Sequence, residues 1–255
     1  MIRFSSLGSG SKGNATLVEA GETRLLIDCG FSAREIEKRL ALLACEADQL
    51  TGILLTHEHG DHARGVWVLA KRYNLPVYMS GGTAKALTAS KTVALHIITQ
   101  GLAFQVGAIT VLPVAVPHDA REPLQFVFTY KGLKLGILTD IGHVTPHVLR
   151  CYSACDGLLV EANHDAVMLA AGPYPHSLKQ RVGGAWGHLN NAQTAALLAG
   201  LELSSLQVLV VGHISQKNNA MALLKGVIEP VTERIPKVVY ASQDEGTGWL
   251  ALNEG

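Results

Sequence analysis

Five short apolar segments of the chain each end at a residue that can bind a metal ion. Their length and their Val, Ile and Leu content predict buried strands. The end residues are His57 after GILLT, His118 after VAVP, Asp140 after GILT, Glu161 and His164 within LLVEANH, and His213 after VLVVG. Because sites are built on loops at one edge of a sheet, we expect these residues to gather there.

The loop THEHGDH (56–62) places four potential metal ligands within six positions. His57 and His59 can face one ion from an extended turn, and the adjacent Asp61 and His62 can face a second. Burying these groups together without a metal would cost desolvation free energy. Imidazole and carboxylate ligands suit Zn²⁺ or Mn²⁺. We therefore predict a site for two divalent metal ions.

Each ion needs further ligands, and the strand ends supply them. We expect His118 to complete the first site, His213 to complete the second, and Asp140 to bridge the two ions. Alternatively, each of these residues is an ordinary polar side chain that has found a hydrogen-bond partner and binds no metal.

Composition excludes several classes of protein. The chain has 255 residues, 48% of them hydrophobic, and a formal net charge of zero. One domain over residues 1–255 is the simplest organisation, and a global basic field for nucleic acid is absent. No apolar run approaches a membrane span, and Met1 leads into IRFSSLG without a signal peptide. We expect the four cysteines to be reduced thiols in a cytoplasmic protein. A homo-oligomer is compatible with the sequence.

Strand patterns alternate with helix patterns along the chain. We expect helices over 32–43, 62–73, 146–155, 190–201 and 218–231, and two short ones within 164–182. Strand groups between them predict an α/β protein with more than one sheet covered by helices.

The motif THEHGDH, followed by single His, Asp and His residues at strand ends, resembles the metallo-β-lactamase fold. The resemblance covers nearly the whole chain. It implies an αββα sandwich of two mixed β-sheets flanked by helices, with a dinuclear site along one edge. The motif is specific for this fold and not for one reaction.

Two further segments resemble the phosphodiesterase branch of that fold, which includes tRNase Z. They are VEANHD (160–165) and GHLNNAQTA (187–195). The resemblance implies that His188, held by Glu161, protonates the leaving group. Asp61 would bind a metal and orient the bridging hydroxide that attacks phosphorus. A β-lactamase would have Cys in place of Asp140, so that activity is not expected.

Four segments resemble the YycJ/WalJ group of bacterial exonuclease-like proteins: SLGSGSKGNAT, LIDCGFS, PYPHSLKQRVGGAWGHLNNAQ and GHISQKNN. The resemblance implies 5′-to-3′ exonuclease action on DNA. Asn190 departs from the usual Ser, and His143 and His176 stand where aromatic residues are expected. Alternatives are a hydrolase of a small ester, thioester or lactone on the same metal site, and a non-catalytic, metal-stabilised regulatory protein.

Candidate substrate contacts flank these motifs. The loop SLGSGSKGN (6–14), around Lys12, would cradle a phosphate with its backbone N–H groups, or would be a plain hairpin turn. The other candidates lie in HSLKQR (176–181) and SQKNN (215–219) or at His164, and each could instead be a polar side chain exposed to solvent. The predicted contacts are Lys12, His164, Lys179, Arg181, Ser215 and Asn218.

Overall fold

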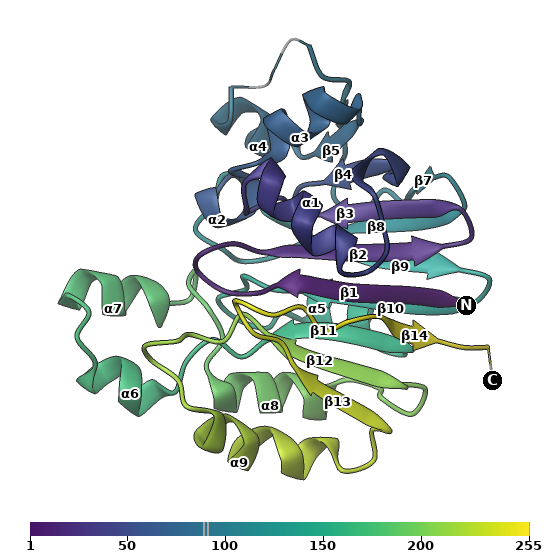
Figure 1. Cartoon of the computed structure of the whole chain (residues 1–255). Coiled ribbons are helices and arrows are strands. Elements are labelled where there is room, and N and C mark those ends of the chain that lie inside the picture. Colours follow the sequence, from purple (N-terminus) through teal and green to yellow (C-terminus); the bar gives the residue numbers. More distant parts are fainter. Residues whose placement is uncertain (89, 91, 255) are drawn as a thin grey trace.

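Two seven-stranded sheets face each other, with helices on their outer sides (Figure 1). This computed structural model describes residues 1–88, 90 and 92–254. The first sheet has the strand order β14-β1-β2-β3-β4-β5-β6, and the second has the order β13-β12-β11-β10-β9-β8-β7. The αββα sandwich predicted from the sequence is therefore confirmed.

Each sheet is mixed, with antiparallel pairing in one part and parallel pairing in the other. In the first sheet β1 to β3 pair antiparallel and β3 to β6 pair parallel. In the second sheet β7 to β10 pair antiparallel and β10 to β13 pair parallel. The strands are β1 (Ile2–Gly8), β2 (Ala15–Ala20), β3 (Thr23–Ile27), β4 (Gly52–Leu54), β5 (Val77–Met79), β6 (Leu95–Ile97), β7 (Phe104–Val106), β8 (Ile109–Ala115), β9 (Leu124–Tyr130), β10 (Leu133–Leu138), β11 (Gly157–Glu161), β12 (Val208–Gly212), β13 (Lys237–Tyr240) and β14 (Leu250–Leu252).

The helices lie close to where their patterns predict them. Ser32 caps the first by accepting from the backbone N–H of Glu35, and Asn190 forms a capping box with Gln193 at the eighth. They are α1 (Ala33–Ala41), α2 (Gly60–Ala63), α3 (Val66–Tyr73), α4 (Gly81–Ala86), α5 (Pro146–Tyr152), α6 (Ala166–Ala171), α7 (His176–Val182), α8 (Asn191–Gly200) and α9 (Met221–Thr232), with a 3₁₀ turn at Ala47–Gln49.

The single helix predicted over 62–73 is wrong, because two helices, α2 and α3, occupy this stretch. The helical conformation is interrupted at Gly65, whose N–H donates to the carbonyl oxygen of Cys29 at 2.8 Å. A Cβ at Gly65 would lie 2.2 Å from the carbonyl oxygen of Phe31. The break therefore lets the metal-ligand loop pack closely on the turn after β3.

Aliphatic side chains and a few phenylalanines fill the space between the sheets. Phe4 and Leu25 of the first sheet share one buried cluster with Phe126, Leu135 and Val210 of the second. Separate clusters lie under α1 and α3 on one side and under α5, α8 and α9 on the other. A core shared by both sheets is what we expect of one domain, and the single-domain organisation stays a prediction.

Parallel pairing places the functional loops at one edge. β10, β11 and β12 run parallel, so the residues that follow them emerge at the same edge of the second sheet. β3 and β4 are parallel neighbours in the first sheet, and the metal-ligand loop follows β4. In the part of the chain that the structure describes, no helix is long and apolar enough to cross a membrane.

Gly30 supports the metal-ligand loop through a close backbone contact. A Cβ at this position would lie 1.7 Å from the carbonyl oxygen of Asp61. We predict that Gly30→Ala lowers the free energy of unfolding by about 1–3 kcal/mol because the two loops must separate. Urea titration of the metal-free protein measures this. Gly60→Ala is the matched control, since a Cβ there meets nothing within 4 Å; equal effects of both substitutions would contradict the prediction.

Candidate metal centre

The seven predicted metal ligands lie together in one cluster between the two sheets' loop edges. The ligand atoms of His57, His59 and His118 lie within 4.8 Å of one another, as do those of Asp61, His62 and His213. Asp140 groups with His57 and His62, and also with Glu161, His188 and His213. Its position between the two sets is the one a bridging carboxylate needs.

Three strands end in an unusual backbone conformation at the cluster. Asp28 follows β3 with φ of 63°, Asp140 follows Thr139 after β10 with φ of 51°, and His213 follows β12 with φ of 51°. A positive φ is uncommon for residues other than glycine. Such conformations gather at functional sites, where the surrounding structure holds them.

Several histidines of the cluster are fixed through one ring nitrogen, which leaves the other free for a metal. His62 Nδ1 donates to Asp28 Oδ2 at 2.7 Å. His57 Nδ1 lies 2.9 Å from the hydroxyl of Thr56, which itself donates to Asp28. His118 Nδ1 donates to the carbonyl oxygen of Gly187 at 3.1 Å. Outer partners of this kind orient metal-binding imidazoles.

Sequence reasoning missed Asp28 and Thr56 as orienting residues. Asp28 follows the apolar segment LLI, so the strand-end rule that found the other residues would also have found it. Thr56 gives no comparable signal, because its role depends on the distance between the first two loops. Asn14 was also missed; its Nδ2 lies 3.1 Å from His62 Nε2 and 3.4 Å from Asp61 Oδ2.

The loop 9–14 belongs to the segment for which a phosphate cradle and a plain hairpin turn are the two alternatives. Its backbone N–H groups are used inside the protein: Gly10 N donates to Asn14 Oδ1, Lys12 N to Gln243 Oε1, and Gly13 N to the Gly10 carbonyl. Asn14 N donates to the carbonyl oxygen of Asp61. Most of the loop's N–H groups therefore bond within the protein and to the metal-ligand loop, while Ser11 lines both cavities at the cluster; phosphate binding by this loop stays a prediction.

Asp140, His62 and His213 hold one another in charged form, whereas burial lowers the pKa of His57 and of His118. Burial would raise the pKa of Asp140, but His213 and His62 hold it well below its usual range. Burial alone would lower the pKa of His213, yet Asp140 and Glu161 raise it to about 10. In the same way Asp140 and Asp28 hold the pKa of His62 well above its usual value. Positive charge is therefore favoured around the carboxylate of Asp140.

Two buried atoms in the cluster have no hydrogen-bond partner among the described residues. They are Asp140 Oδ2 and His213 Nδ1, in side chains that are almost fully buried. Asp140 Oδ2 lies 3.3 Å from His62 Nε2 and His213 Nδ1 lies 3.3 Å from Asp140 Oδ1, but neither contact has hydrogen-bond geometry. A buried polar atom without a hydrogen bond is costly unless a ligand satisfies it. Imidazole and carboxylate donors around such atoms fit divalent metal ions.

His188 and Glu161 form a pair at the mouth of the cluster. His188 Nδ1 donates to Glu161 Oε2 at 3.0 Å. The other oxygen, Oε1, accepts from the backbone N–H groups of Ile141 and Leu189. Burial would raise the pKa of Glu161, but His188 and His213 lower it to about 2. Glu161 is thus a fixed anion that orients the imidazole of His188, and His188 lines both neighbouring cavities.

Two cavities adjoin the cluster, and they share Ser11, Asp61, Val182 and His188 as wall residues. The larger has a volume of about 350 Å³ and includes Arg181, which forms an ion pair with Asp119. The smaller, of about 100 Å³, includes Ser215 and Asn218. These three of the predicted substrate contacts therefore face cavities at the cluster.

The other three predicted contacts lie elsewhere. Lys179 Nζ donates to the carbonyl oxygen of Ala170. His164 is 2% exposed and lies 3.3 Å from Asn163 Oδ1 through Nδ1. Lys12 is exposed, and neither cavity has it among its described walls. Of His143 and His176, the first donates to the carbonyl oxygen of Ala185 and the second begins α7.

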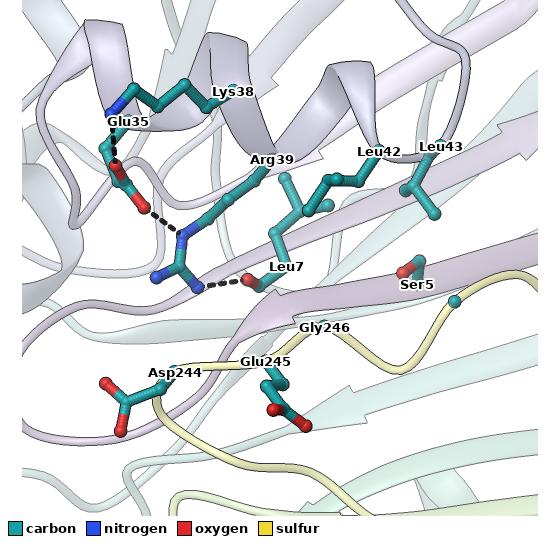
Figure 2. Close-up of a pocket in the computed structure, with 11 residues that line it drawn as sticks. Ser5, Leu7, Glu35, Lys38, Arg39, Leu42, Leu43, Asp244, Glu245 and Gly246 are labelled. Carbon is teal, nitrogen blue, oxygen red and sulfur yellow. Dashed lines mark hydrogen bonds and ion pairs between the residues drawn. The ribbon is translucent and has the colours of Figure 1, made fainter.

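A roomier cavity, of about 500 Å³, lies between α1 and residues 244–248 (Figure 2). Arg39 crosses it, donating to Glu35 and to the carbonyl oxygen of Leu7, while Leu42 and Leu43 cover its other half. Its described walls hold none of the predicted ligands. Its volume therefore does not make it the reaction site.

Comparison with known proteins agrees with this geometry. Residues 23–214 match the β-lactamase superfamily domain. The chain is 34% identical over 236 residues to exodeoxyribonuclease YycJ of Bacillus anthracis, which is 91% of this chain and 89% of that protein. It is 34% identical over 228 residues to exodeoxyribonuclease WalJ of Streptococcus pneumoniae, which is 87% of this chain and 85% of that protein.

Among solved structures, Zn²⁺-bound PqqB from Methylobacterium extorquens has the same fold. The TM-score is 0.74 with 18% identity, over 98% of this chain and all of that one. The sequence match, the two-sheet architecture and the cluster of histidines and carboxylates lead to one conclusion. The chain belongs to the metallo-β-lactamase superfamily, and it is a metal-dependent hydrolase.

Proposed function

We propose that this protein is a dinuclear metal-dependent phosphodiesterase that acts on DNA as an exonuclease, digesting in the 5′-to-3′ direction. The observation that carries the proposal is His188, which is held by the buried Glu161 beside the ligand cluster. A positioned imidazole can protonate an alkoxide leaving group. The exodeoxyribonuclease names of the two relatives support the choice of DNA.

The residues present fit two divalent ions, which we propose to be Zn²⁺ or Mn²⁺. His57, His59 and His118 would hold one, Asp61, His62 and His213 the other, and Asp140 both. When bound, the ions would supply Lewis acidity that lowers the pKa of water and neutralises charge on the phosphate.

The chain's own residues would carry the remaining work. Asp61 is only partly buried and lines both cavities, so its carboxylate can orient an attacking water. Glu161 holds His188 through Nδ1, which leaves Nε2 to pass a proton to the departing oxygen. The anionic form of Glu161 stabilises the imidazolium before that transfer.

The walls of the two cavities favour a phosphodiester over a small apolar ester. They are lined largely by hydroxyl, amide, imidazole, carboxylate and guanidinium groups. A small-ester hydrolase would need an apolar recess at the metal cluster, as ligand pockets are predominantly apolar. We further propose a cytoplasmic location, since Cys29, Cys45, Cys151 and Cys155 are all free thiols.

End-labelled single- and double-stranded DNA tests the function. With added Mn²⁺ or Zn²⁺, we expect stepwise loss of nucleotides from the 5′ end. Asp140→Ala should abolish this loss and reduce bound metal, because the carboxylate shared by both ligand sets is gone. Gel analysis of the products gives the direction. Intact DNA after incubation with fully metal-loaded protein would overturn the proposal.

Substitution of His188 should lower kcat without loss of metal, whereas substitution of a metal ligand should lower both metal content and kcat. We predict that His188→Ala keeps its metal but lowers kcat by about 10²- to 10⁴-fold, the usual loss for a missing general acid. Mass spectrometry of bound metal and steady-state kinetics measure the two effects. His96→Ala, at an exposed position on β6, is the control. Unchanged kcat in His188→Ala at equal metal content would remove the assigned role.

Metal binding should release protons. In the metal-free protein His213, with a pKa of about 10, and His62, with a raised pKa, hold protons at neutral pH. A metal needs the neutral imidazole, so binding must displace those protons. We predict that metal affinity rises with pH above neutrality, as protons leave His213. Calorimetry at pH 7 in buffers of different ionisation heat counts the released protons, and a count of zero would contradict this.

A further inference from the structure

The smaller cavity beside the cluster has a wall that the proposed chemistry does not use. Its lining residues include His188 and His213, and also Tyr174, Ser215 and Asn218. The second group comes from the segment between α6 and α7 and from the loop after β12. The wall is therefore close to the reaction centre but separate from the predicted ligands.

Asn218 is the unusual member of this wall. It is 1% exposed, and neither Nδ2 nor Oδ1 has a hydrogen-bond partner within the described chain. Its neighbour Asn219 is different, because its amide bonds to Asn191 and to the carbonyl oxygen of Ala162. Buried amides are nearly always paired. An unpaired one that lines a cavity indicates a ligand that supplies the partner.

The backbone fixes this amide in place. Asn218 N donates to Ser215 Oγ at 3.1 Å, and the Asn218 carbonyl accepts from Asp165 N at 2.9 Å. A Cβ at Gly172 would lie 2.5 Å from Asn218 Oδ1, so glycine leaves the room that the amide occupies. The polar group is thus preorganised before any ligand arrives.

The surroundings of Asn218 suit an anion. Ser215 Oγ already accepts from a backbone N–H, which leaves its own proton to donate into the cavity. Lys217 Nζ lies 5.8 Å from the centre of the ring of Tyr174, so a positive charge is close to one of the wall residues. Asp61 is the one carboxylate among the described wall residues, and it is a predicted metal ligand. An amide N–H and a hydroxyl can both donate to a phosphate oxygen.

Size restricts the occupant. A volume of about 100 Å³ holds several waters, since one water needs about 10–15 Å³. It is well below the roughly 300–1,000 Å³ of pockets for drug-sized ligands. A phosphate group fits within it, whereas a nucleoside does not. We propose that this pocket binds the terminal phosphate monoester of the nucleic-acid chain, through Asn218 and Ser215.

The proposal rests on the proposed phosphodiesterase function and adds the form of its substrate. The pocket shares Asp61 and His188 with the larger cavity. A chain end anchored in the pocket therefore presents a phosphodiester close to that end to the reaction centre. Removal of residues from a phosphorylated terminus would follow from the anchoring.

Four chromogenic esters test the pocket. They are thymidine 3′-(p-nitrophenyl phosphate), with and without a 5′-phosphate, and thymidine 5′-(p-nitrophenyl phosphate), with and without a 3′-phosphate. We expect one of the two terminal phosphates to raise kcat/KM by at least about tenfold, the value of a hydrogen bond to a charged group. The arm that responds identifies which end the pocket holds.

Variants then assign the effect to Asn218. Asn218→Ala and Asn218→Asp should each reduce the preference for the phosphorylated ester at least about fivefold, the second by charge repulsion. Both should fold, because the side chain has no partner to lose; thermal unfolding checks this, with Asn219→Ala as the destabilised comparison. Asn253→Ala is the matched control, since this exposed asparagine lies beyond β14 and uses its backbone for its bonds to Gln207.

The outcomes separate the two proposals. Hydrolysis at equal rates with and without both terminal phosphates would overturn the pocket and leave the phosphodiesterase function standing. The same holds if the wild-type preference persists in both Asn218 variants. If the metal-loaded protein cleaves none of the four esters and no DNA, both the function and the pocket are overturned.

Discussion

Asp140 is 2% exposed and faces the imidazoles of His62, His118, His188 and His213, so the cost of burying its charge governs the design of the site. A carboxylate at such depth needs compensating positive charge. In the metal-free protein His62 and His213, whose pKa values are raised, provide it, and divalent ions would provide it more strongly. The rigid outer partners, such as Asp28 and Gly187, keep the imidazoles aimed at that charge.

The sandwich is the means by which this charge balance is assembled. One sheet supplies the loop from His57 to His62, and the other supplies His118, Asp140 and His213. The parallel half of each sheet brings most of those loops to the same edge, and β8, which runs in the same direction as β10, brings His118 there. The packed aliphatic core between the sheets fixes the distance between the two halves of the cluster. Packing and chemistry are therefore linked through the same few strand ends.

Much of this site could be predicted from the sequence, because apolar segments that end at His or Asp report both the strand and its functional end. Asp28 was missed although it follows an apolar strand as the other residues do, whereas Thr56 escaped prediction because its role is a contact between the ends of two strands. The loop around Lys12 was open to two interpretations, since the fate of its N–H groups depends on Gln243, more than two hundred residues away. Asn218 was predicted by its position, but its lack of a partner is a property of the folded protein alone.

The order of the strands also determines when the protein can acquire metal during its synthesis. β14 pairs with β1, so the first sheet lacks its edge strand until residues 250–252 have left the ribosome. His213 is the last of the predicted ligands to emerge, long after the loop containing His57. A nascent chain thus displays half a binding site with no opposing half. The complete set of predicted ligands therefore exists only late in synthesis, once His213 has emerged and the second sheet can fold against the first.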